Sequence, residues 1–515
     1  MVNAFIINSN DSISEMNSEQ VYALTTISEI KDSGLNYPYS HENQPDIYIA
    51  HGNHKKIIIG KDGTYVFKMK THTTANTPLF GERARTNLFL KINGTHPNLS
   101  TSTSSGKINS ISNITNAHIF KLKAGDYVEF CSTLSSNYKD KDTVRSTNIS
   151  GYTGNLADGQ AVLSPTMSAF AFEIQEFEET RYETIFSPQF CILKSYTHIK
   201  KLSENNLVAF EVENSMGDNI QVDGDGLITA NKDLTLQFGS HHTIIGLKSS
   251  GYSNFSDNTG QVNVYLVKLN GTKKLISNCV QSVALDGQTN SLYTGTIVKM
   301  EAGDKIEYRA YVSNNVEISS TPFISHYVKN APHFLRCYRS KDNHMFGHFN
   351  WESTKTNEAE IVNIQNNNII SSNGALSINN DNSFSLTSNN FIGNYLLQFQ
   401  LNAQVEDIDG AGLSKLEDGI SGLIQSWIEF SIDSGISWIP YEQSNSSITV
   451  HKRGSQKTLE TFVIGSFKDV NTRFRLTVSS HNPRGKLNTK IGTRKLIHTT
   501  NDVIPSSGTF SIVQI

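Results

Sequence analysis

The chain has 515 residues, a formal net charge of -4 and a hydrophobic content of 37%. This balance offers no basic surface for a nucleic-acid backbone, which argues against genome packaging and against nucleic acid as a partner. No apolar run approaches the ~18 residues of a membrane span, and Met1–Asn8 lacks the basic start and apolar core of a secretory signal. We therefore expect about three domains, no membrane insertion and synthesis in a cytoplasm.

Residues 1–50 show no regular alternation of apolar and polar residues, and we expect an N-terminal arm that packs on a neighbour. A first module is predicted over residues 51–178. It opens with the strand Gly63–Met69 and closes with the strand Ser168–Ile174, in each of which alternate residues point to one face of a sheet. Asn93-Gly94 follows alternating apolar residues and predicts a two-residue hairpin turn.

Two motifs of the first module recur further along the chain at one offset. Leu90–Thr95 is matched by Val267–Thr272, and Leu122–Phe130 by Met300–Tyr308. Because two separate motifs share the offset, internal duplication predicts a second module over residues 201–330. The repeated Ala-Gly-Asp is predicted to be a turn.

The aspartates of this turn, Asp126 and Asp304, could be considered functional because they recur. Aspartate side chains also accept backbone N–H bonds in turns, and repetition then preserves a turn. We therefore expect a structural role for both residues.

Prolines mark the expected boundaries between modules. After the predicted closing strands Ser168–Ile174 and Thr321–Val328, the sequence Ser187–Phe190 resembles Ala331–Phe334. Proline fixes φ, so we expect short, stiff joints at residues 179–200 and 331–360.

Residues 361–515 repeat the order of elements seen in the first two modules. The predicted strands are Gly393–Leu401, Trp427–Ile432, Arg473–Val478 and Gly508–Ile515. The Ala-Gly-Asp turn is missing here, so a divergent third module is expected.

Several of these segments are similar to the globular head domain of the C1q/TNF-like family. They are the opening Gly63–Phe67, the Ala-Gly-Asp segments and the ending Ser168–Ile174, and in the second module Asn206–Val212 and Gly224–Thr229. The resemblance implies an all-β fold of tandem jelly-roll β-sandwich modules that assemble as trimers. Both a homotrimer and an internal pseudo-trimer are conceivable, and we expect the homotrimer because a divergent third module would spoil a pseudo-threefold core.

No catalytic, cofactor-binding or metal-binding residue is predicted. His344 and His348, and the pair His241-His242, are weighed as metal ligands, but we expect loop or strand for the first pair and a loop for the second. Asp223–Gly226 and Glu406–Gly410 offer oxygen ligands suited to calcium, although turn chemistry explains both, and calcium binding stays open.

We also expect the cysteines, and Trp427 among the tryptophans, to have structural roles. Because the cysteines lack close spacing, isolated buried thiols are expected instead of disulfides or zinc ligands: Cys131, Cys191, Cys279 and Cys337. The tryptophans could stack on sugars, and we expect Trp427 to reach a core instead: Trp351, Trp427 and Trp438.

C1q/TNF-like modules also occur in bacteriophage virion proteins, and the Asn, Ser and Thr richness, tandem repeats and few cysteines suit that setting. We expect a non-enzymatic structural protein of the virion surface, either a fibre or tail appendage or a capsid decoration. Its expected partners are copies of itself, other virion proteins and a host-surface glycan or receptor. A carbohydrate-binding or glycan-depolymerising protein and a cell-surface adhesin are alternatives.

Overall fold

The computed structural model describes residues 4–9, 19–30, 47–75, 84–97, 102–106, 110–136, 147–149, 152–155, 161–164, 167–174, 190–195, 206–246, 259–284, 289–312, 316–318, 333–340, 343–349, 351, 359–364, 367–407, 421–451, 456–481, 487–491 and 508–515. Across these ranges the chain forms 38 β-strands and one 3-10 turn, η1 (Asn389–Phe391). No helix in these ranges is long and apolar enough to cross a membrane.

Each of three modules contains an inner sheet of five strands in the same spatial order. The strands of the first module are, in that order, β3 (Thr25–Ile30), β1 (Ala4–Ser9), β14 (Met167–Glu173), β6 (Gly63–Ala75) and β9 (Ser110–Leu122). Those of the second are β17 (Glu211–Met216), β15 (Phe190–Ser195), β26 (His333–Arg339), β20 (Leu234–Gly246) and β23 (Thr289–Met300). Those of the third are β29 (Asn367–Ser372), β27 (His344–Phe349), β38 (Gly508–Gln514), β32 (Gly393–Asp407) and β35 (Gln456–Phe467).

A short sixth strand pairs with the far end of the long strand β6, β20 or β32. These short strands are β11 (Thr147–Ile149), β25 (Val316–Ile318) and β37 (Leu487–Ile491). The inner sheets therefore match strand for strand in all three modules, including the third.

The outer sheets repeat in the same way. The first is β4 (Ile47–Ile49), β5 (Ile57–Ile59), β10 (Tyr127–Ser136), β7 (Ala84–Ile92) and β8 (Ser102–Gly106), with β2 (Glu19–Val21) on β10. The second is β18 (Ile220–Val222), β19 (Ile228–Ala230), β24 (Lys305–Val312), β21 (Thr259–Asn270) and β22 (Thr272–Ala284), with β16 (Asn206–Leu207) on β24. The third is β30 (Leu376–Ile378), β31 (Phe384–Leu386), β36 (Arg473–His481), β33 (Ser421–Ser431) and β34 (Ile439–His451), with β28 (Ala359–Ile361) on β36.

All pairings within these sheets are antiparallel, so each module is a two-layered jelly-roll sandwich. The remaining strands, β12 (Tyr152–Asn155) and β13 (Ala161–Ser164), form a separate hairpin. The predicted fold class of tandem jelly-roll modules is confirmed, and the divergent third module has the same strand order as the others.

Strand β6 shows how the sequence builds these layers. Tyr65, Phe67 and Met69 alternate along β6 and lie in the core of the first module. The opposite face carries Lys68 and Lys70, which are also fully buried. Because a strand has only two faces, another layer must cover this polar face, and that layer comes from the other modules.

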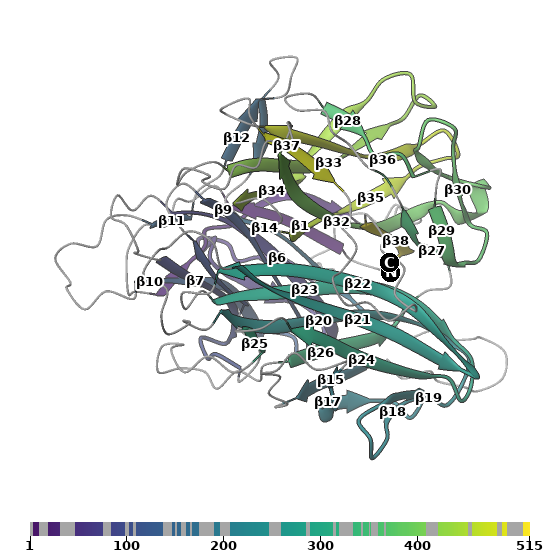
Figure 1. The fold of residues 1–515 in the computed structure, drawn as a ribbon. Helices are drawn as coiled ribbons and strands as arrows, with labels where there is room; N and C mark the ends of the chain where they lie inside the picture. The colour runs from purple at the N-terminus through teal and green to yellow at the C-terminus, as the bar shows by residue number, and fades with distance from the viewer. Residues whose placement is uncertain are drawn as a thin grey trace.

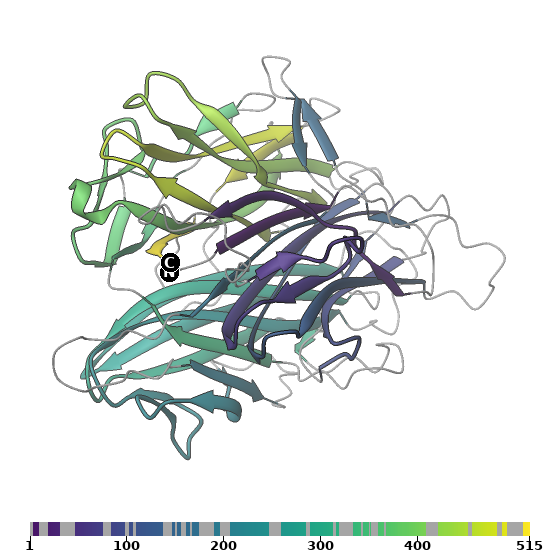
Figure 2. The same ribbon diagram turned by 180° about the vertical axis from the view of Figure 1, so that it is seen from behind.

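The three modules close into a ring around their inner sheets, as Figures 1 and 2 show with the second module in teal and the third in green to yellow. The outer strand β8 of the first module bridges to inner strand β23 of the second, and β22 of the second bridges to β35 of the third. Strand β34 of the third module packs on β9 of the first. Each module thus contacts the next in one repeated manner, and the third contact closes the ring.

The strand pairings correct the expected domain boundaries. The described parts of residues 1–50 do not form an arm on a neighbour, because β1 pairs with β14 of its own chain. The expected joint 179–200 contains β15, the first strand of the second module, and the joint 331–360 contains β26 and β27. The predicted strand Thr321–Val328 lies outside the described residues, and β26 occupies the closing position of the second module.

The resemblance between the two proline segments was therefore misleading. Phe190 begins β15, and Phe334 lies in β26, which pairs directly with β15. Phe190 and Phe334 therefore lie in the first and last strands of one module, not in two equivalent joints.

Candidate functional site

The Asn-Gly motif and the Ala-Gly-Asp motif lie together at one end of the first module and are joined by hydrogen bonds. The Asn93 side chain donates to Asp126 Oδ1 over 2.8 Å and accepts a bond from the Tyr127 backbone N–H. Asn93 and Gly94 have φ of 50° and 75°, as a type I′ turn requires. In the first module the two repeated motifs thus form one hydrogen-bonded corner of the jelly roll.

Asp126 and Asp304 cap the Ala-Gly-Asp turns, as expected. Asp126 Oδ2 accepts the Lys123 N–H and Asp304 Oδ2 accepts the Glu301 N–H, each over 2.7 Å. The bond from the Lys123 backbone, followed by the one from Asn93, lowers the pKa of Asp126. In the third module Asp469 accepts backbone N–H bonds from Asn471 and Thr472, so a different sequence builds the corresponding turn.

The acidic segment Asp223–Gly226 is a turn as well. Asp223 Oδ1 accepts the N–H groups of Asp225 and Leu227, and Lys305 Nζ lies 2.8 Å from its other oxygen. The bond from Lys305 is the main cause of a lowered pKa at Asp223. Of the segment Glu406–Gly410, residues 408–410 lie outside the described ranges. Among described residues, no group of three or more His, Cys, Asp or Glu side chains could hold a metal ion.

The two histidine pairs both lie in inner strands. His344 and His348 belong to β27, where every residue is buried. His241 and His242 were expected in a loop, but both lie inside β20, at 3% and 0% exposure. The expectation was wrong because β20 runs far beyond its apolar start Leu234–Phe238. His241 lies on the face that the neighbouring modules cover, and His242 lies on the opposite face, where its ring is 6.3 Å from that of Tyr308 of the same module.

The tryptophans have structural partners. Trp427 is buried, as predicted, and its indole N–H donates to Glu429 over 3.0 Å. Trp438 stacks against the Arg475 guanidinium, 4.0 Å from the ring centroid, and donates to the Gly435 carbonyl. Trp351 packs against the core of the third module.

The buried polar residues that sequence reasoning missed meet where the three inner sheets face one another, and we call this cluster the junction. Lys68 Nζ of the first module lies 2.5 Å from Glu460 Oε1 of the third. The same ammonium group lies 4.6 Å from the ring centroid of Tyr293 of the second module and 4.4 Å from that of Phe462. One side chain of the first module therefore contacts both other modules.

Lys70, one step along the same face of β6, also binds the third module. Its Nζ donates to the Ser444 carbonyl over 2.7 Å and to Ser446 Oγ over 2.9 Å. Burial holds the pKa of Lys70 well below its usual value, the charge of Glu460 opposes this shift, and the charge of Lys68 adds to it. Hydrogen bonds that Lys70 donates to β34 thus satisfy an amine that is removed from water.

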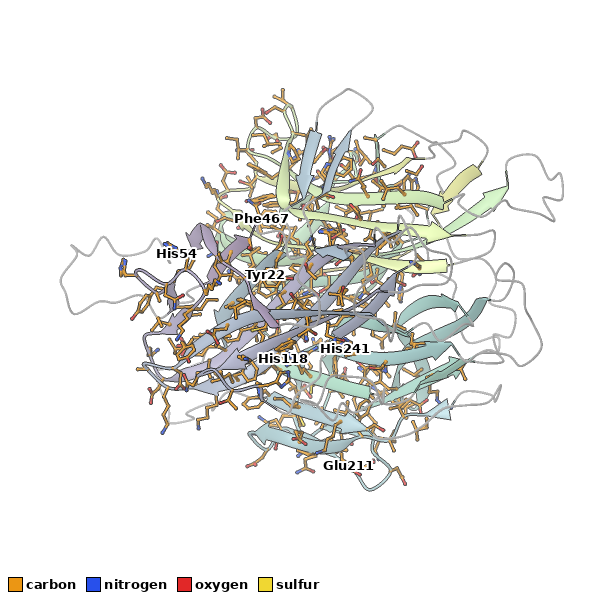
Figure 3. The ribbon with its side chains drawn as sticks, turned by 90° about the vertical axis from the view of Figure 1, so that its left-hand side faces the viewer. Tyr22, His54, His118, Glu211, His241 and Phe467 are labelled. Carbon is orange, nitrogen blue, oxygen red and sulfur yellow. The ribbon has the colours of Figure 1, made fainter. Side chains whose placement is uncertain are left out.

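The second module contributes Arg336 and His241 to the junction, and His118 of the first module lies nearby; Figure 3 labels both histidines. Burial lowers the pKa of Arg336 to about 10. Burial and then the charge of Arg336 lower the pKa of His241 to about 3 and hold the pKa of His118 well below its usual value. Both imidazoles are therefore neutral near pH 7.

The three faces of the junction differ at matching positions, and the differences are complementary. The central residues of the long strands are Lys68, Gly239 and Gln398, and opposite them on β9, β23 and β35 lie Ala117, Gly295 and Phe462. A Cβ on Gly295 would lie 3.1 Å from Gln398 Oε1, so glycine makes room for the side chain of another module. Phe462 in turn packs edge-on against Phe170.

The structure shows the internal pseudo-trimer, which was the alternative to the expected homotrimer. The homotrimer was preferred because unequal modules were thought to spoil a threefold core. In the structure the trimeric arrangement of jelly rolls is internal to one chain. Different residues at matching positions form contacts such as the Lys68–Glu460 ion pair, which three identical faces could not form. The inner faces that a homotrimer would need are already buried.

One feature of the sequence could have indicated the junction. Lysines and histidines alternate with core residues along β6, at Lys68, Lys70 and His72, where a solvent-exposed face would also be polar. Polar alternation alone cannot distinguish solvent from a polar protein interface, so the partners in other modules could not be identified.

Comparisons with known proteins add little to this description. No family model and no curated protein matches the chain. Among solved structures, crystal structures of murine APRIL at pH 5.0, pH 8.0 and pH 8.5 share 13 to 14% identity with it, at TM-scores of 0.22 to 0.23. Each match covers 30% of this chain and 99% of the other.

Proposed function

We propose that this chain is a non-enzymatic structural protein of the bacteriophage virion surface, either a fibre or tail appendage or a capsid decoration. It would be made in the host cytoplasm and carried on the particle. Its partners would be other virion proteins and a glycan or receptor on the host surface.

The observation that carries the proposal is the closed ring of three jelly rolls in one polypeptide. The ring buries the inner face of every module, so contacts with other molecules would be made by the outer sheets. A single chain can thereby occupy a position that otherwise needs three copies of a one-module protein, which suits a repeated building block of a particle. The Asn, Ser and Thr richness and the resemblance to virion modules support the same assignment.

Analysis of purified particles tests this proposal. Peptides of the chain should be found by mass spectrometry in particles purified by density gradient, and gold-labelled antibodies should mark one recurrent position by electron microscopy. Peptides found only in the soluble fraction of the lysate would contradict it. Hydrolysis of bacterial surface glycans by the purified chain, abolished by one carboxylate substitution, would favour the depolymerase alternative instead.

A further inference from the structure

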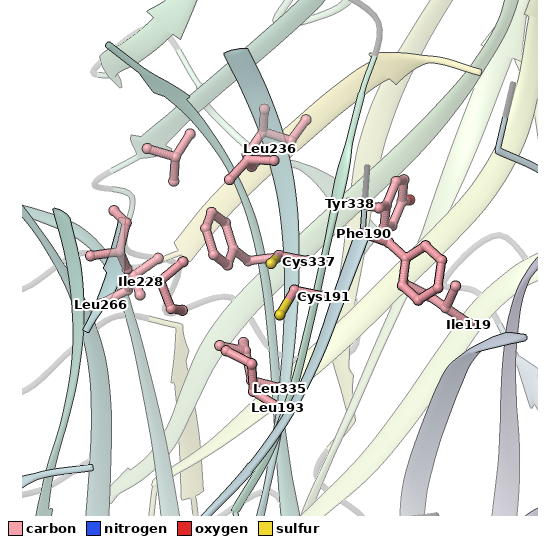
Figure 4. Close-up of a cluster of buried hydrophobic side chains, with 14 of the residues drawn as sticks. Ile119, Phe190, Cys191, Leu193, Ile228, Leu236, Leu266, Leu335, Cys337 and Tyr338 are labelled. Carbon is pink, nitrogen blue, oxygen red and sulfur yellow. The ribbon is translucent and has the colours of Figure 1, made fainter. Parts of the chain in front are cut away.

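Two thiols face each other across the first and last inner strands of the second module. In the antiparallel pair β15 and β26, Cys191 lies directly opposite Cys337. Both side chains are buried, at 1% and 0% exposure, and neither is in a disulfide. Figure 4 shows the two sulfur atoms side by side among apolar residues. The expectation of isolated thiols is therefore wrong for this pair, which lies 146 positions apart in the sequence but in register in the sheet.

The two thiols contact each other inside the core of the second module. A hydrogen bond between the two thiols, followed by burial, raises the pKa of Cys337 well above its usual value. Directly opposed residues in an antiparallel pair have Cβ atoms about 4.5–5.5 Å apart, whereas a disulfide needs about 3.5–4.5 Å. A shift of about 1 Å between the two strands would thus bring the pair within bonding geometry.

We propose that Cys191 and Cys337 form a redox modification site, a cross-strand dithiol that a small disulfide oxidant converts into a disulfide. One thiolate attacks the oxidant, forms a mixed disulfide and releases one small thiol. The other protein thiolate then attacks the mixed disulfide and releases the second small thiol. The two protein thiols lose two electrons and two protons, and the oxidant is reduced to two thiols.

The position of the pair gives the bond a structural consequence. Strand β15 is the first strand of the second module and β26 is its last, so the disulfide would close nearly the whole module into one covalent loop. Such a loop restricts the unfolded chain strongly. Because the strands must approach each other to form it, the bond would also be strained and readily reduced. We infer that this disulfide would reversibly stabilise the second module, independently of the function proposed above.

Peptide mapping of the full-length chain tests the site. The native protein, and protein refolded from denaturant, would each be incubated with glutathione disulfide, alkylated and digested. We expect a Cys191–Cys337 linked peptide, formed slowly in the native arm because the thiols are buried, and quickly on refolding. The melting temperature should rise by about 5 °C, and dithiothreitol should reverse the rise.

Three variants provide the controls. Cys191→Ala and Cys337→Ala should each lose the gain in melting temperature. Cys131→Ala should keep it, because buried Cys131 lies opposite Val21 and Phe89 and has no cysteine across the strand. Absence of the linked peptide from both arms, or an oxidised chain that melts no higher than the reduced one, would overturn the proposal.

Discussion

Lys68 and Glu460, which are 392 residues apart in the sequence, form a buried ion pair across the contact between the first and third modules. Both side chains are almost fully removed from water, and Lys70 lies beside them. An isolated charge in this position would be costly, so each charge requires the other. The pair fixes which module meets which, because Gly239 and Gln398 occupy the positions that correspond to Lys68.

We predict that Lys68→Met destabilises the chain by about 3–5 kcal/mol, because it leaves the carboxylate of Glu460 buried without its ion-pair partner. Denaturant unfolding followed by fluorescence measures this change.

The matched control is the double variant Lys68→Met/Glu460→Leu, which removes both charges. It should be at least 2 kcal/mol more stable than Lys68→Met, since an apolar pair has no charge to desolvate. If the double variant loses, relative to the parent, the sum of the losses of Lys68→Met and Glu460→Leu, the two residues are not coupled.

Gly125→Val and Gly303→Val should each disrupt one module. The two glycines have φ of 93° and 90°, and an added Cβ would meet no atom within 4 Å at either position. The loss of about 1–3 kcal/mol is therefore due to backbone strain alone. Limited proteolysis should show new cleavage near the affected module.

Gly224→Val is the control for the turn variants, since Gly224 also has open space around it and does not require a positive φ. It should melt close to the parent. Melting of both turn variants at the parent temperature would show that the Ala-Gly-Asp turns tolerate a side chain.

Acid should weaken the junction through its buried histidines. The folded-state pKa of His241 is about 3, against an ordinary value of 6.5, so between these values the folded chain binds fewer protons than the unfolded chain. Stability from this group is fully present above pH 6.5 and is lost as the pH falls toward 3, by roughly 1 kcal/mol per pH unit.

Unfolding free energies measured from pH 7.5 to 4.5 test this dependence. His241→Gln should reduce the slope, whereas His54→Gln, at an exposed loop position, should leave it unchanged. Equal slopes in the parent and in His241→Gln would contradict a neutral, buried His241.

Local turn chemistry made much of the fold predictable from the sequence. Asn93-Gly94 and the Ala-Gly-Asp turns have residue requirements that follow from φ. Their repetition identified two modules, and the resemblance of these segments to the C1q/TNF-like family implied the jelly-roll class. The third module was harder to identify because its corresponding turn is capped by Asp469 and does not contain the Ala-Gly-Asp motif.

Neither the ring nor the junction could be predicted from local sequence patterns. Strand β20 alternates polar residues such as Gln237 and His241 with core residues, as a solvent-exposed strand would, and only the neighbouring modules make its polar face an interior. The opposition of Cys191 and Cys337 depends on the pairing of strands from opposite ends of one module. Such contacts are set by topology, which local patterns do not specify.

The central claim is that the three inner faces close on one another within a single chain. Light scattering coupled to size-exclusion chromatography, at micromolar protein concentration, tests it most directly. We predict the mass of one chain, 57.1 kDa, because the surface that would build a threefold core is already buried. A stable species of about three times that mass, with no single-chain peak on dilution, would contradict the internal ring.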